Sequence, residues 1–118
     1  MNTSKENRMH HRVQPDNLLA LLSYESKVVK IIDISEGGMA FHYVSKRCLT
    51  DIFPNLQLDI LHRNNNYLND INVFVVSDSL IVEGSLSIRR CGVKFNNLSS
   101  RQQEKIHEFL LCYSEGNA

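Results

Sequence analysis

The sequence lacks an excess of charge of either sign, and this absence limits the partners that it can attract. Of its 118 residues, 13 are Lys or Arg and 13 are Asp or Glu, so the formal net charge is zero. A chain without a global field is not drawn onto a polymer of DNA or RNA, nor onto an anionic membrane. A small anion that binds at a local site is compatible with this composition.

The sequence also has few cysteines and no long apolar run. Cys48, Cys91 and Cys112 form an odd set without CxxC spacing, and the N-terminal residues MNTSKENRMHH lack the apolar core of a signal peptide. No apolar run approaches the roughly 20 residues that span a bilayer. We therefore expect a cytoplasmic protein without membrane insertion. Its length suits one domain.

Signatures of catalysis, metal binding and phosphate loops are absent as well. DISEG is similar to the nucleophile elbow G-x-S-x-G, but Asp33 stands where the first glycine would be, so a hydrolase that uses Ser35 is the weakest hypothesis. His10 and His11 are adjacent, so they do not face the same way on a helix or a strand. No P-loop or G-x-G-x-x-G is present. We expect no catalytic residue, no metal site and no cofactor.

What the sequence does contain is a series of short apolar segments between turns. Residues 1–17 are polar and have no hydrophobic period, so we expect a flexible N-terminal arm. The bend at residues 36–38 contains two glycines, which supply the positive φ that such bends often need. Residues 78–85 are expected to form a connection. The predicted strands are 18–24, 27–35, 39–44, 56–62, 71–77 and 86–95.

The hydrophobic period changes near the C-terminus. Within residues 98–114, apolar side chains recur at i, i+3, i+4 and i+7, which predicts an amphipathic helix. Either Ser99 with Gln102 or Ser100 with Gln103 forms a capping box at its start. Six short strands without a helical crossover, followed by one helix, favour an all-β fold. We predict a small six-stranded antiparallel β-barrel over residues 18–118, with the C-terminal α-helix covering one opening.

Two short motifs are not explained by the fold alone. RMHHR places Arg8 and Arg12 four residues apart, and DISEGG places Asp33, Ser35 and Gly38 in the spacing D-x-S-x-x-G. Each motif alone is common, the first as a solvated charge pattern and the second as ordinary turn chemistry. Together, in this order and some twenty residues apart, they resemble the two signature elements of the PilZ domain family.

The resemblance extends over most of the chain. GMAF after the second motif, CGVKF at residues 91–95 and the terminal helix continue it from about Arg8 to Leu111. PilZ domains are six-stranded barrels that bind the bacterial second messenger cyclic di-GMP. The resemblance therefore implies a receptor and not an enzyme.

The same resemblance implies a role for each motif residue. Arg8 and Arg12 would grip the ligand from the arm, and Asp33, Ser35 and Gly38 would form the floor on the barrel. These residue types suit the task, because a guanidinium forms a bidentate fork with guanine O6 and N7 or with phosphate oxygens. A carboxylate such as that of Asp33 accepts from the N1–H and N2–H₂ donors of guanine.

The function implied is a single-domain receptor in which cyclic di-GMP orders the arm and signals to a separate, unidentified partner protein. The alternative is a PilZ-fold protein-interaction module that binds no nucleotide. Because Asn7 stands where many relatives carry a further arginine, the ligand stoichiometry stays open. Arg89 or Arg90 either reaches the ligand or lies on a solvated strand edge. The downstream pathway and the oligomeric state are open too.

Overall fold

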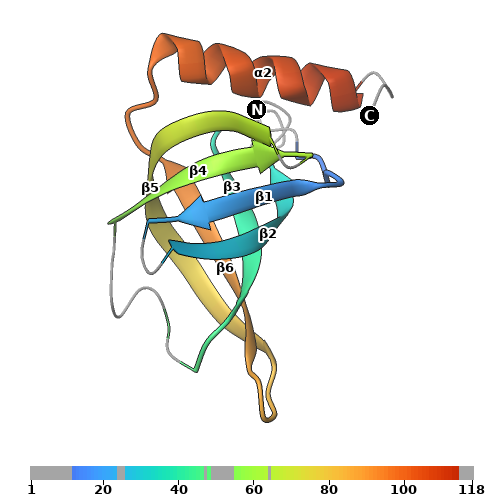
Figure 1. Ribbon diagram of the computed structural model, residues 1–118, viewed down its shortest axis with the longest axis vertical. Helices are drawn as coiled ribbons and strands as arrows, with labels where there is room; N and C mark the ends of the chain where they lie inside the picture. The colour runs from blue at the N-terminus through green and yellow to red at the C-terminus, as the bar shows by residue number, and fades with distance from the viewer. Residues whose placement is uncertain (1–11, 24–25, 47, 49–54, 64, 115–118) are drawn as a thin grey trace, which may run out of the picture.

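The structure of the protein is a computed structural model that describes residues 12–23, 26–46, 48, 55–63 and 65–114. Arg8 of the predicted site lies outside these residues. Six strands and one helix occupy the described part of the chain (Figure 1). They are β1 (Leu18–Leu22), β2 (Lys27–Ile34), β3 (Gly38–Val44), β4 (Asn55–His62), β5 (Asn65–Val82), β6 (Ile88–Phe95) and α2 (Ser100–Ser114).

The six strands form a closed antiparallel barrel in the order β1-β2-β3-β6-β5-β4, which confirms the predicted fold. Alternation of side chains explains why these segments suit a barrel. In β1, the sequence LLALL buries Leu18, Ala20 and Leu22 and leaves the two intervening leucines partly exposed. Because side chains alternate between the two faces of a strand, one face of each segment lines the core.

The C-terminal helix α2 lies across one end of the barrel, as predicted (Figure 1). Its apolar stripe joins the core through Ile106, Phe109 and Leu110. The helix begins with the first of the two capping boxes considered. The Gln102 amide N–H donates to Ser99 Oγ at 3.1 Å, and the Ser99 amide N–H donates to Gln102 Oε1 at 2.8 Å.

One predicted connection is wrong. Residues 78–85 were expected to link two strands, but β5 continues to Val82 and pairs with β6 as far as Ile88. The polar Asp78 suggests a loop in the sequence, whereas in the structure it points inward and accepts from Arg89 Nε at 2.6 Å. Its second partner is the hydroxyl of Tyr43. A non-local ion pair thus keeps a polar residue inside a strand.

Candidate functional site

A β-bulge in β2 turns Asp33 away from the barrel core. Val29 and Ile31 are buried at alternate positions, and continued alternation would place Asp33 inside. The register of β2 against β3 shifts between Ile31 and Asp33, so that Ile34 becomes the next buried residue. An extra residue in one strand reorients the side chains that follow it. The acid in this apolar run therefore lies at the surface of the barrel.

Two arginines from distant parts of the chain meet at Asp33. Arg12 Nη1 donates to Asp33 Oδ1 at 2.5 Å, and Arg90 Nη2 donates to Asp33 Oδ2 at 2.8 Å. The Asp33 side chain is only 13% exposed, whereas those of Arg12 and Arg90 are 59% and 39% exposed. Each guanidinium carries five N–H donors, so most of these donors are not used by Asp33. The cluster has one net positive charge and can bind an anion.

The backbone just after Arg12 is attached to β2. The amide N–H of Val13 donates to the Ile34 carbonyl and the amide N–H of Ile34 donates to the Val13 carbonyl, both at 3.0 Å. Further along, the Asp16 amide donates to the hydroxyl of Tyr113 in α2 at 3.1 Å. The last residues of the predicted arm therefore contact both the barrel and the helix, which brings Arg12 to Asp33.

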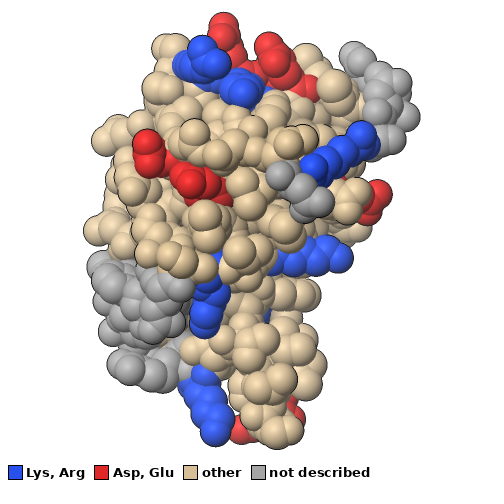
Figure 2. Space-filling view, viewed as in Figure 1, with Lys and Arg blue, Asp and Glu red and all other residues tan. Residues whose placement is uncertain are grey.

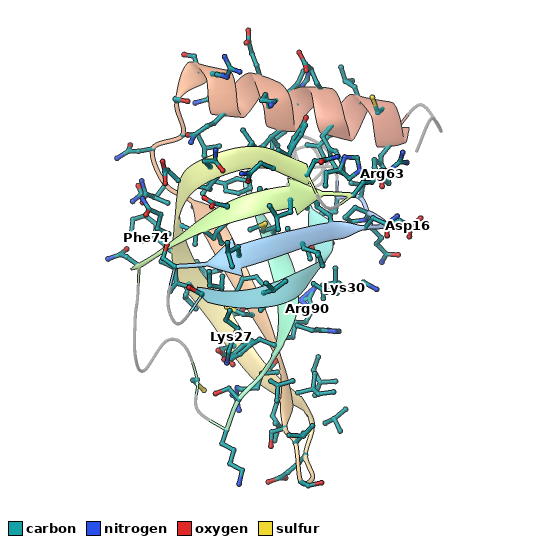
Figure 3. All side chains as sticks on the ribbon, in the orientation of Figure 1. Asp16, Lys27, Lys30, Arg63, Phe74 and Arg90 are labelled. Carbon is teal, nitrogen blue, oxygen red and sulfur yellow. The ribbon has the colours of Figure 1, made fainter. Side chains whose placement is uncertain are left out.

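A row of basic side chains continues from Arg90 across the outer surface. In the strand registers, Lys30 of β2 pairs with His42 of β3, and His42 pairs with Arg90 of β6. Residues that pair across neighbouring strands share a face. Figure 3 shows Lys30 and Arg90 on the same side of the barrel. Lys30 thus gives this surface a further cationic donor.

Ser35 and Gly38 close the turn between β2 and β3. Ser35 is 2% exposed, and its amide N–H donates to the Gly38 carbonyl at 2.8 Å. The Ser35 hydroxyl donates to the same carbonyl and accepts from the amide N–H of Gly37, each at 3.3 Å. The hydroxyl thus stabilises the turn that follows Asp33.

Gly38 is needed for close strand packing and not for a left-handed backbone. Its φ lies outside the positive range, so the prediction that the glycine supplies a positive φ is wrong at this position. A Cβ at Gly38 would lie 2.1 Å from the carbonyl oxygen of Val93 in β6. Glycine therefore permits β3 and β6 to approach each other beside the turn.

The turn also contacts α2. Glu36 Oε2 and His107 Nδ1 are 2.6 Å apart, and both side chains are about half exposed. A cavity of ≈ 410 Å³ lies between the turn and the helix. Its lining includes Glu36, Gly37, Lys94, Phe95, Gln103 and Ile106. The segment that carries Asp33 and Ser35 is thus connected directly to the C-terminal helix.

The structure brings Arg12 and Asp33 into contact and places Ser35 and Gly38 in the adjacent turn. Arg90 is the residue that sequence reasoning left undecided. The signal was present, because Arg90 directly precedes CGVKF, but its partner depends on pairing between distant strands. Within the described residues there is no group of three or more His, Cys, Asp or Glu placed to hold a metal ion. The described helix is also too short and too polar to cross a membrane.

Comparisons with known proteins identify related sequences and folds. The family model described as PilZ domain matches residues 6–112. Among solved structures, the chain is similar to the MrkH–c-di-GMP complex of K. pneumonia, with a TM-score of 0.70 and 18% identity. The similarity covers 91% of this chain and 52% of that one. MrkH in its apo state matches with a TM-score of 0.67 and 18% identity, over 86% and 48% of the two chains.

A shorter structure matches over nearly all of its length. The PilZ domain of YcgR from Escherichia coli with c-di-GMP has a TM-score of 0.64 and 11% identity, and the similarity covers 91% of each chain. The present chain spans about half the length of the MrkH chains that it matches. At these identities the structural similarity shows the fold alone. A search of curated proteins gives no match.

Proposed function

This chain belongs to the PilZ domain family, and from that membership we propose that it is a cytoplasmic, non-catalytic receptor for cyclic di-GMP. The ligand binds between Arg8 and Arg12 on one side and Asp33, Ser35 and Gly38 on the other. One observation supports this proposal most strongly: Arg12 and Arg90 converge on the carboxylate of Asp33. The c-di-GMP named in the MrkH and YcgR structures is consistent with it.

In this proposal, the ligand replaces one of the two arginines that pair with Asp33. Guanine offers N1–H and N2–H₂ donors that compete with a guanidinium for the carboxylate oxygens. The Arg12 side chain is 59% exposed, and Arg90 also pairs with Asp33, so release of Arg12 leaves the carboxylate with a cationic partner. The freed guanidinium then binds a phosphate or the O6 and N7 atoms of guanine. Asp33 selects the base, and Arg12 moves from the carboxylate to the ligand.

The remaining cations complete the proposed site. Arg90 is less exposed than Arg12 and keeps Asp33 in position while it offers its other N–H groups to the ligand. Lys30, in the same row of strand partners, adds a positive charge for the two phosphates. Ser35 and Gly38 maintain the turn, so that the ligand lies against the backbone that follows Asp33.

Binding signals through the arm and the turn. Arg8 and Arg12 close together over the ligand and present a new surface to a partner protein. The contact between Glu36 and His107 is a second route, by which a change in the turn reaches α2. The output in this proposal is a changed surface and not a chemical reaction.

A thermal-shift assay with cyclic di-GMP tests the proposal. A ligand at about 100 times its Kd adds about 2.7 kcal/mol to the free energy of unfolding, which raises Tm measurably. Asp33→Ala, Arg12→Ala and Arg90→Ala should each reduce this shift. Arg101→Ala provides a matched control, because Arg101 is an exposed arginine on α2. Absence of a shift in the native protein would favour the interaction module that binds no nucleotide.

A further inference from the structure

A cavity of ≈ 340 Å³ lies between the barrel and the C-terminal half of α2. Its wall includes His62, Arg63 and Tyr67 from the barrel and Glu108, Phe109 and Tyr113 from the helix. The backbone at this end of β4 is anchored, because the amide N–H of Arg63 donates to the carbonyl of Asn17 at 3.0 Å. Figure 3 shows Arg63 below the C-terminal half of α2. The barrel and the helix therefore form this cavity together.

Four aromatic rings form much of the wall, and they are inclined to one another. The His62 ring packs edge-on against Phe109, with ring centroids 5.2 Å apart and ring planes at 87°. Tyr67 and Tyr113 also pack against Phe109, at interplanar angles of 57° and 37°. Rings at such angles turn their faces in different directions. The face of an aromatic ring attracts cations, and Lys105 Nζ already lies 4.5 Å from the centroid of the Tyr67 ring.

Two opposite charges belong to different parts of the same wall. Burial and the charge of Arg63 lower the pKa of His62, so Arg63 lies near that ring. Burial and the charge of Glu108 raise the pKa of Tyr67, so Glu108 lies near the other ring. Among the residues that the structure describes, neither Arg63 nor Glu108 belongs to an ion pair. The wall thus offers a cationic group beside one ring and an anionic group beside another.

His62 is an uncharged part of this wall. Because its pKa lies below the ordinary value, the ring is uncharged at neutral pH. Its Nε2 atom is buried and has no hydrogen-bond partner among the described residues. A neutral ring tolerates this isolation better than an imidazolium, because burial of a charge costs far more than burial of a neutral polar group. The ring therefore does not repel a cationic group in the cavity.

We propose that the cavity binds a small zwitterion with a quaternary ammonium group and a carboxylate, of about the size of glycine betaine. The ammonium group lies against the inclined rings and near Glu108, and the carboxylate pairs with Arg63. A quaternary ammonium group has no N–H donor, so aromatic rings replace its water without leaving a donor unpaired. On the face shown in Figure 2, basic and acidic side chains are interspersed around the helix end of the molecule. These surroundings favour a ligand without net charge.

Tyr113 connects the cavity to the N-terminal segment. Its hydroxyl accepts from the amide N–H of Asp16 at 3.1 Å, four residues after Arg12. A molecule against the Tyr113 ring thus contacts the side chain that holds this segment on α2. The proposal does not rest on the nucleotide site, because neither Arg12 nor Asp33 lines the cavity.

An NMR titration of the full chain with glycine betaine, up to about 50 mM, tests the proposal. The expected result is a saturable shift of the ring signals of Tyr67, Phe109 and Tyr113, with a Kd of about 1 mM or below. The matched ligand is tert-butylacetate, which has the same shape and carboxylate but no positive charge. It should bind about ten-fold more weakly or less tightly still, because it lacks the attraction between a cation and the ring faces.

Substitution of the two charged groups tests their roles separately. Glu108→Gln and Arg63→Asn should each weaken the binding of betaine about five-fold or more. Asparagine is chosen because Arg63 has a φ of 54°, which asparagine tolerates. Glu104→Gln is the matched control, because Glu104 is an exposed acid one turn earlier on α2 that does not line this cavity.

Three results would overturn the proposal. The first is the absence of a saturable shift of the ring signals, and the second is equal affinity for betaine and tert-butylacetate. The third is a Glu104→Gln variant that loses as much affinity as Glu108→Gln. The three variants replace exposed side chains, and an unchanged Tm would verify that they fold.

Discussion

Replacement of Gly38 by alanine tests whether this motif residue acts through the packing of the barrel. The Cβ of Gly38→Ala would lie 2.1 Å from the Val93 carbonyl oxygen, more than 1 Å inside the 3.4–4 Å of ordinary contact. It would also lie 3.1 Å from the Cα of Lys94. Because these are backbone atoms of β6, no side-chain rotation relieves the overlap. β3 and β6 must separate beside the turn that holds Ser35.

The expected cost follows from that overlap. Added methyl groups in packed regions cost about 1–3 kcal/mol and sometimes more. Since only a backbone shift makes room, we expect a loss of about 3 kcal/mol in the free energy of unfolding, a large part of the roughly 5–15 kcal/mol of a typical domain. With a urea m-value of about 2 kcal/mol/M, the midpoint should fall by about 1.5 M.

Urea denaturation followed by circular dichroism measures this change. Gly84→Ala is the control, because the nearest atom to its new Cβ is the Leu86 carbonyl oxygen at 3.8 Å. That variant should stay within about 0.5 kcal/mol of the native protein. A loss of less than about 1 kcal/mol for Gly38→Ala, or equal losses for the two variants, would refute the packing argument. It would then favour a role for Gly38 in ligand contact alone.

Three further predictions concern the helix, the core and the cysteines. Ser99→Ala removes the side chain that caps α2 and should cost about 1 kcal/mol, measured by urea denaturation. Burial and the charge of Arg63 lower the pKa of His62 below its ordinary value of 6.5. The contribution of His62 to the free energy of unfolding is therefore present above about pH 6.5 and is lost as the pH falls through the lower pKa of the folded state. His62→Phe should therefore flatten the decline of Tm in acid. Burial raises the pKa of Cys91 to about 12, so at about pH 8 roughly one thiol in ten thousand is ionised, and iodoacetamide should label the exposed Cys112 but not Cys91.

Each of these predictions has a result that contradicts it. Ser100→Ala, one residue into the helix, should change stability by less than about 0.5 kcal/mol, and a cost equal to that of Ser99→Ala would exclude the capping box as the cause. A Tm that declines in acid equally with and without His62 would remove His62 as the titrating group. Labelling of Cys91 in the folded protein at the rate of Cys112 would show that the barrel opens at that position.

The fold was predictable because local periodicity specifies it. The alternation of apolar and polar residues in LQLDI of β4 and the helical spacing of Ile106, Phe109 and Leu110 each indicate one buried face. The length of β5 was not predictable, because an aspartate such as Asp78 is typical of a loop. Only the structure shows that Asp78 pairs with Arg89. That partner lies on the next strand, β6, and the contact depends on how β5 and β6 pair.

The candidate site, like the fold, was predictable only in part. The motif identifies Asp33 in the sequence. Its outward orientation, however, results from a single-residue bulge, and regular alternation of side chains would have predicted the opposite orientation. Arg90 lies 57 residues from Asp33 in sequence, and only the pairing of β3 with β6 brings the two together. The packing of Gly38 against Val93 was not predicted, because a close approach between two strands leaves no trace in the local sequence.

The central claim is that this chain binds cyclic di-GMP at Asp33, and isothermal titration calorimetry measures that binding directly. Cyclic di-AMP is the matched comparison, because adenine lacks the N1–H and N2–H₂ donors that a carboxylate recognises in guanine. The account predicts saturable binding of cyclic di-GMP with a defined stoichiometry, much weaker binding of cyclic di-AMP, and loss of that preference in Asp33→Ala. No heat of binding for cyclic di-GMP, or equal affinity for both nucleotides in the native protein, would contradict it.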